Sequence, residues 1–115
     1  MKPTMKTLAA VGLTLAAGLT IPACGGITSD FCNERCSCED CSDIGRDECV
    51  IDTDRDLEIA SVYGCDDPYE ARRQCEIKSY TCVDGRFLVT INDVDPCAVE
   101  AGDLNRCLDD GSGIR

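Results

Sequence analysis

Apolar side chains follow two different patterns along the chain. Near the amino terminus, residues 8–19 form an almost unbroken apolar run of 12 residues, shorter than the ~20 apolar residues of a membrane-spanning helix. Further on, single apolar positions recur at steps of three and four residues, which is the period of an amphipathic α-helix. This stripe consists of Val50, Thr53, Leu57, Ala60 and Gly64, and we expect it to be widened by Ile44, Ile51, Ile59 and Val62.

Capping residues set the bounds of the predicted helices. Ser42 is a good N-cap, Gly64 favours a helix end, and the Asp-Pro pairs at 67–68 and 95–96 are typical of helix starts. Acidic residues 52–56 are expected to kink or interrupt the longest helix, because Asp is a poor helix former away from the first turn. The predicted helices cover residues 31–37, 42 to about 63, 67 to about 80, and 95 to about 109. The second and third would form a central antiparallel hairpin folded near residues 65–66, which predicts a mainly α domain of three or four short helices.

Residues 84–91 carry signals for a turn and a strand. Asp84 and Gly85 are a typical turn pair, and residues 86–91 have strong β-propensity. No neighbouring segment is an obvious partner, so we expect this segment to be extended or to form a short edge. Beyond the last predicted helix, residues 111–115 are expected to be a frayed tail.

Eleven cysteines indicate the class of fold. The chain has no Trp, two Phe and three Tyr, so a small domain would bury too little apolar surface to offset its conformational entropy easily. Such a cysteine content is typical of exported domains that are stabilised by disulfides. The predicted disulfide cysteines are Cys32, Cys36, Cys38, Cys41, Cys49, Cys65, Cys75, Cys82, Cys97 and Cys107. Reflection of the chain about residues 65–66 places Cys49 opposite Cys82, the one bridge that we favour.

A short segment before the first of these cysteines resembles a bacterial lipobox. It has an aliphatic residue at Ile21, a small residue at Ala23, and then Cys24, the position that such a motif acylates and exposes as the mature amino terminus. Two lysines precede the apolar run, as in a secretory signal. An odd number of cysteines in an exported protein calls for an explanation. Lipidation of Cys24 would leave ten cysteines, all of which can pair.

These features divide the chain into four parts. Residues 1–23 are a predicted lipoprotein signal peptide, 24–30 a lipidated tether, 31–110 a disulfide-rich helical domain, and 111–115 the tail. Loss of two lysines with the signal leaves nine basic and 22 acidic side chains, a net charge of −13. Such a surface repels nucleic acid and anionic head groups. We therefore expect membrane contact through the lipid anchor, no nucleic acid, and an unknown protein or envelope partner.

Two further segments each hold a pair of cysteines with nine residues between them, Cys65 with Cys75 and Cys97 with Cys107. This spacing resembles the paired-cysteine helical hairpins of mitochondrial proteins, in which a helix pair is stapled at both ends. Cys65 precedes the predicted helix start, and the lipobox implies a bacterial envelope. We therefore interpret the likeness as coincidence.

The cluster of Cys32, Cys36, Cys38 and Cys41 offers an alternative chemistry. Its spacings fit a zinc thiolate site loosely. Cys38 and Cys41 also form a Cys-x-x-Cys pair, but the two acidic residues between them would raise the thiol pKa values rather than lower them. An oxidising compartment favours disulfides at all four positions, so a metal-binding or thiol-redox protein is the alternative interpretation.

Other chemistry has little support in the sequence. Residues 52–56 resemble the opening of an EF-hand loop, but the positions that require Gly and Glu hold Leu57 and Tyr63. A solvated acidic helix face is therefore expected there. The chain has no His, so a Ser or Cys nucleophile would lack its commonest activating base. We expect no enzyme, no cofactor and no metal.

As a whole the chain is similar in style to the small, acidic, cysteine-rich lipoproteins of myxobacteria, which generally have no assigned function. The resemblance implies a lipid-anchored, disulfide-stapled and non-catalytic module of the cell envelope with a structural or interaction role. Gly25, in place of Asp after the acylated cysteine, resembles lipoproteins that are sorted to the outer membrane. We expect an outer-membrane location, either periplasmic or surface-facing.

Overall fold

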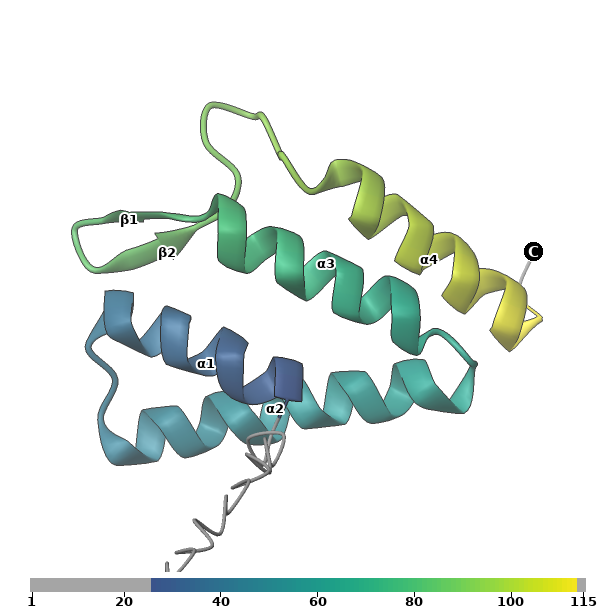
Figure 1. Ribbon diagram of the computed structural model, residues 1–115, viewed down its shortest axis with the longest axis horizontal. Coiled ribbons are helices and arrows are strands. Elements are labelled where there is room, and N and C mark those ends of the chain that lie inside the picture. Colours follow the sequence, from purple (N-terminus) through teal and green to yellow (C-terminus); the bar gives the residue numbers. More distant parts are fainter. Residues whose placement is uncertain (1–25, 114–115) are drawn as a thin grey trace, which may run out of the picture.

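The computed structural model describes residues 26–113, and within them the chain forms four helices and one small β-hairpin (Figure 1). The elements are α1 (Gly26–Glu39), α2 (Asp43–Val62), α3 (Asp66–Ser79), β1 (Thr81–Val83), β2 (Arg86–Leu88) and α4 (Ala98–Ser112). Helix α3 runs through the middle, with α1 and α2 on one side and α4 on the other. This confirms the predicted mainly α, disulfide-rich class of fold.

Helix α2 is continuous, so the predicted kink at residues 52–56 is wrong. Its start is as predicted, because the Ser42 side chain accepts a hydrogen bond from the Gly45 amide at 3.1 Å. Midway along the helix, buried Thr53 has its hydroxyl 3.6 Å from the Cys32 sulfur. On either side of Thr53, Asp52 forms an ion pair with Arg55 and Asp56 forms one with Arg73. Tertiary packing therefore outweighs the weak helix propensity of this stretch.

The expected width of the apolar stripe on α2 is also wrong. Thr53 and Ala60 are buried, and Val50 and Leu57 pack at the edges of the core. In contrast, Ile44, Ile51, Ile59 and Val62 are exposed. Thr53 lies nine residues after Ile44 and nine before Val62, about two and a half helical turns in each direction. The additional apolar residues therefore project from the side of the helix opposite the core.

Helices α2 and α3 form the predicted antiparallel hairpin, joined by a tight turn at residues 63–65 (Figure 1). Gly64 adopts a φ of +70° just after the helix end, a conformation that favours glycine. Helix α1 packs against both α2 and α3. Because α1 packs against both helices, cysteines of α2 and of the segment after α3 can pair with α1 instead of with each other. Simple reflection of the chain about the turn does not allow for this.

The β-hairpin supplies the partner strand that the sequence did not reveal. β1 pairs antiparallel with β2, with Thr81 opposite Leu88 and Val83 opposite Arg86. Asp84 and Gly85 form the predicted turn with φ values of 51° and 71°, the signs that a type I′ turn requires. Of the expected segment 86–91, only residues 86–88 are in the strand. The next turn, around Asn92, is closed by a bridge between residues 91 and 94.

Several element bounds differ from those predicted. Helix α1 begins at Gly26, five residues before the expected start, so residues 26–30 of the expected tether are helical. Helix α3 starts at Asp66, and α4 at Ala98 rather than at the preceding Asp-Pro pair. Helix α4 also continues to Ser112, which places residues 111–112 of the expected tail in the helix. Residues 1–25, with the predicted signal peptide and Cys24, and residues 114–115 lie outside the described residues.

The core consists of two small clusters instead of one large one. The first contains Ala60, Cys65, Tyr69 and Leu104, from α2, α3 and α4 and the turn before α3. The second contains Phe31, Cys32 and Cys49, against which Val50, Ile77 and Phe87 pack. Cysteines make up five of the nine buried apolar residues in the described part of the chain, as expected for a domain with few large aromatic residues.

Gly111 allows a close approach between α4 and the end of α2. A Cβ atom at Gly111 would lie 2.8 Å from the Tyr63 Cβ and 3.1 Å from the Tyr63 carbonyl oxygen. Gly111→Ala is therefore expected to lower the free energy of unfolding by about 1–3 kcal/mol, although Ala normally favours a helix. Gly102→Ala in the same helix is the matched control, because nothing lies within 4 Å of the added atom.

For Gly102→Ala we expect a gain of roughly 0.5–1 kcal/mol. Urea denaturation of both variants with the disulfides intact measures the difference. Equal gains for the two variants would contradict the close contact between Gly111 and Tyr63.

Candidate functional site

All ten cysteines among the described residues form disulfides. The pairs are Cys32–Cys49, Cys36–Cys41, Cys38–Cys82, Cys65–Cys107 and Cys75–Cys97. Helix α1 carries three of these cysteines, α2, α3, α4 and β1 carry one each, and the other three lie just before or between these elements. The eleventh cysteine, Cys24, lies outside the described residues. Because the other ten pair among themselves, no second cysteine of this chain is left for it.

The favoured bridge between Cys49 and Cys82 is wrong. Cys49 pairs with Cys32 of α1, and Cys82 pairs with Cys38 near the end of the same helix. The chain leaves the helical conformation at Tyr80, so Cys82 lies on β1 rather than on the helix face shared with Cys75. Both partners, Cys32 and Cys38, therefore lie in α1, a helix that reflection of the chain about residues 65–66 did not consider.

Helices α3 and α4 form a pair stapled at both ends. Cys65 immediately precedes α3 and bonds to Cys107 in the second half of α4, while Cys75 in α3 bonds to Cys97 just before α4. Equal spacing in two antiparallel helices places the first cysteine of each opposite the second of the other. The spacing that we interpreted as coincidence is thus the basis of this stapled helix pair. The correction concerns the geometry of the two helices and implies no relation to mitochondrial proteins.

The Cys-x-x-Cys pair does not form a bond of its own. Cys38 is bonded to Cys82, and Cys41 is bonded to Cys36 across the turn after α1. A thiolate site built from Cys32, Cys36, Cys38 and Cys41 would require reduction of three disulfides, since Cys32 is bonded to Cys49. The alternative metal or redox chemistry therefore depends on reduced cysteines, whereas the structure has oxidised ones.

Carboxylates also do not assemble a convincing cation site in the described part of the chain. Residues 52–56 are helical and not a loop, and two of their carboxylates are paired with Arg55 and Arg73. One other group brings the Glu100 carboxylate within 4.8 Å of the sulfurs of Cys75 and Cys97. Both sulfurs belong to one disulfide, so this group offers a single carboxylate ligand.

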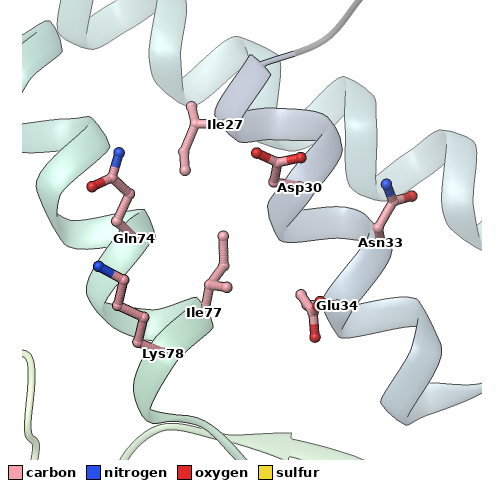
Figure 2. A pocket seen from close by; sticks show the side chains of 7 residues that line it. All are labelled: Ile27, Asp30, Asn33, Glu34, Gln74, Ile77 and Lys78. Atoms are coloured by element: carbon pink, nitrogen blue, oxygen red, sulfur yellow. The ribbon is translucent and has the colours of Figure 1, made fainter. Parts of the chain in front are cut away.

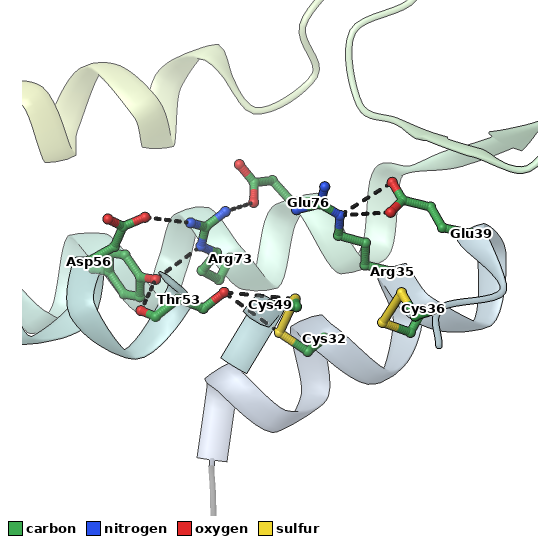
Figure 3. Close-up of a disulfide and its surroundings, with 11 residues drawn as sticks. Cys32, Arg35, Cys36, Glu39, Cys49, Thr53, Asp56, Arg73 and Glu76 are labelled. Carbon is green, nitrogen blue, oxygen red and sulfur yellow. Dashed lines mark hydrogen bonds and ion pairs between the residues drawn. A yellow bond between two sulfur atoms is a disulfide. The ribbon is translucent and has the colours of Figure 1, made fainter. Parts of the chain in front are cut away.

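Among the described residues, Arg73 of α3 contacts side chains of α1 and α2 as well as of its own helix. Figure 3 shows its bonds to Asp56 of α2 and to Glu76. The Arg73 guanidinium lies 4.4 Å from the centre of the Phe31 ring. It donates hydrogen bonds to the Glu76 carboxylate at 2.8 Å and to the Tyr69 hydroxyl at 3.2 Å, and reaches Asp56 of α2 at 3.5 Å. Although burial opposes the charge, hydrogen bonds with Tyr69 and Glu76 raise the pKa of Arg73.

This cluster is structural in character, because each of its charges is already satisfied by a neighbour. Tyr69 donates to the Thr53 carbonyl at 3.0 Å, and Glu76 accepts a second ion pair from Arg72 at 3.1 Å. The sequence contained part of the signal, since residues 69, 73 and 76 are spaced three and four apart on a predicted helix. The contacts with Phe31 and Asp56 depend on tertiary packing and were missed.

Two phenols in the domain have raised pKa values. Burial of Tyr69 raises the pKa of its hydroxyl above the ordinary 10.0, because the tyrosinate form would be desolvated. Tyr80 donates a hydrogen bond to the Glu34 carboxylate at 2.9 Å, and this bond to the neutral form raises the pKa of Tyr80. Both groups are neutral in the folded protein at neutral pH.

The domain is therefore expected to lose stability in alkali. A phenol whose pKa is raised on folding stabilises the fold fully below its ordinary pKa, and this contribution falls as pH rises through about 10 and beyond. The free energy of unfolding should decrease over that window, and tyrosinate absorbance should show late-titrating phenols. Tyr69→Phe should remove one late-titrating group. Titration of Tyr69 and Tyr80 at the ordinary pKa would contradict this account.

A shallow groove lies between α1 and α3, with a volume of about 320 Å³ (Figure 2). Ile27 and Ile77 face each other across it, and the Asp30 carboxylate points toward it from α1. The rim is formed by Asn33, Glu34, Gln74 and Lys78. Most of these polar side chains are exposed. The groove therefore lacks the buried, convergent polar groups that an enzyme site needs.

Within residues 26–113, none of the helices combines the length and the apolar character that crossing a membrane would take. Comparison with protein-family models, curated proteins and solved structures finds nothing that matches this chain.

Proposed function

We propose that this chain is a lipid-anchored module of the cell envelope, held rigid by disulfides, that has a structural or interaction role and no catalytic one. The observation that carries the proposal is the pairing of ten of the 11 cysteines within the domain. The cysteine left over is Cys24, which follows the segment that resembles a lipobox. Acylation of Cys24 would account for the one cysteine that has no disulfide partner in the domain.

The compartment and the charge support the same function. Five disulfides in a small domain are typical of proteins that fold in an oxidising compartment. All 22 acidic side chains of the chain lie within the described residues, so the folded domain carries the whole excess of negative charge. Such a domain would stand off an anionic bilayer and be retained there by its acyl chains.

The start of α1 limits the distance between the folded domain and its anchor. The helix begins at Gly26, two residues after Cys24, so the connection from the anchor to the fold spans at most about 7 Å when extended. The domain would thus be held within a short distance of the membrane surface in spite of the charge repulsion, with little freedom to move away from it. That placement suits a module that presents a fixed surface to a neighbour in the envelope.

Replacement of Cys24 tests the anchor. For Cys24→Ser we expect the protein to leave the membrane fraction and the detergent phase and to appear in the aqueous phase. The control is Cys36→Ala/Cys41→Ala, which also replaces cysteines, removing the Cys36–Cys41 disulfide, but should stay with the membrane. Retention of Cys24→Ser in the membrane fraction, or wild-type protein in the aqueous phase, would contradict the proposal.

A further inference from the structure

Helix α2 has an apolar line on its solvent side that the rest of residues 26–113 leaves exposed. Ile44, Ile51 and Val62 are 72%, 60% and 75% exposed. They are spaced by seven and 11 residues, about two and three helical turns, so they lie on one line along the helix. We call these three residues the outer stripe. It runs nearly the whole length of the longest helix in the described part of the chain.

Acidic side chains border the outer stripe on both sides. Asp47, Glu48, Asp54 and Glu58 are all exposed and lie within about a quarter turn of it by helical geometry. Arg55 is the one basic residue on the stripe itself, and its guanidinium is paired with Asp52 at 2.8 Å. The face is therefore an apolar line with a net negative border.

This border argues against a bilayer as the occupant. Helices that lie in a membrane interface carry Lys and Arg beside the apolar face, where they meet head groups. Here carboxylates would be pressed against phosphates, which costs free energy. A second copy of the chain is disfavoured for the same reason, because pairing of two outer stripes would oppose carboxylates with carboxylates.

We infer that the outer stripe of α2 is a docking surface for a basic amphipathic helix of a partner protein. Apolar side chains of that helix, at spacings of seven and 11 residues like those of the stripe, would pack on Ile44, Ile51 and Val62. Its flanking Lys or Arg would meet the acidic border. The inference specifies the interaction role proposed above and rests on that role, but it does not require Cys24 to be acylated.

The test uses a defined probe and the full chain from its native membranes in phosphatidylcholine nanodiscs, or in solution if it is not acylated. The probe is a fluorescent helical peptide of about three heptads with Leu at a and d and Lys at e and g. A second peptide with Glu in place of each Lys is the charge control. Fluorescence anisotropy at physiological salt measures the dissociation constants, with empty nanodiscs as the blank.

The decisive variant is Ile44→Ser/Ile51→Ser/Val62→Ser, which keeps every charge. We expect it to bind the Lys peptide at least about tenfold more weakly, because three apolar contacts are lost. The matched control is Val94→Ser/Val99→Ser, two equally exposed apolar residues elsewhere, and it should bind like the wild type. The Glu peptide should not bind.

Four results would overturn the inference. They are absence of binding of the Lys peptide, equal binding by the triple variant, self-association of the chain that the triple variant abolishes, and stripe-dependent binding to anionic vesicles. Equal binding would mean that the acidic surface attracts cations without a defined site. None of these results depends on the membrane fractionation of Cys24→Ser, so failure of docking and failure of anchoring are separate outcomes.

Discussion

Removal of the Cys65–Cys107 disulfide is expected to lower the free energy of unfolding by about 3–4 kcal/mol. This bridge spans 42 residues of sequence and closes the α2 end of the α3–α4 pair. The unfolded chain gains much freedom when so long a loop is opened, although the nested Cys75–Cys97 bridge limits the gain. The variant is Cys65→Ala/Cys107→Ala, and urea denaturation without reductant provides the measurement.

Cys36→Ala/Cys41→Ala is the comparison, because that bridge spans only five residues. Its loss should cost about 2 kcal/mol. The ordering of the two variants is the sharper test, since it depends on the connectivity as well as on the existence of the bridges. A larger loss for the short bridge would contradict the pairing described for the α3–α4 pair.

Replacement of Arg73 by Met is expected to lower the free energy of unfolding by about 2–4 kcal/mol. The Glu76 side chain is only 10% exposed, and it would lose its shorter ion pair while keeping the one with Arg72. The Phe31 ring would lose a cation at 4.4 Å from its centre. Met retains much of the aliphatic stem, so the loss reports mainly on the charge.

Two further variants test whether the loss of stability is specific to the Arg73 cluster or follows from the removal of any arginine charge. Arg106→Met removes an exposed pair with Asp103 and should change stability by no more than about 0.5 kcal/mol. Arg73→Met/Glu76→Gln should be less destabilised than the sum of its single variants, because the carboxylate that loses its shorter ion pair is also removed. Additive losses, or a loss from Arg73→Met as small as that from Arg106→Met, would show that the cluster is not a central contact of the fold.

Local signals in the sequence predicted most of the helices and both turns. Ser42 caps α2 as expected, Gly64 ends it, and the Asp84 and Gly85 pair forms its turn, because each depends on atoms a few residues apart. The start of α1 was missed because residues 24–30 were expected to be a tether. Helix formation from Gly26 buries Thr28 and brings Ile27 to the first core cluster.

The long-range features could not be obtained from spacing. The partner of Cys49 depends on where α1 packs, and no residue near Cys49 in sequence specifies that. Likewise, apolar residues occur on both sides of α2, so the sequence pattern alone did not tell which side faces the core. The structure separates Thr53 and Ala60, which are buried, from Ile44 and Ile51, which are exposed. That separation shows that the outer stripe has no partner within the described part of the chain.

The intact mass of the protein from native membranes, measured with and without reduction and alkylation, tests the central claim most directly. We predict a mass that carries acyl groups on a chain beginning at Cys24, no alkylation before reduction, and ten alkylated thiols after it. A chain without acyl groups would contradict the anchor. Thiols that alkylate before reduction would contradict the complete pairing of the ten cysteines.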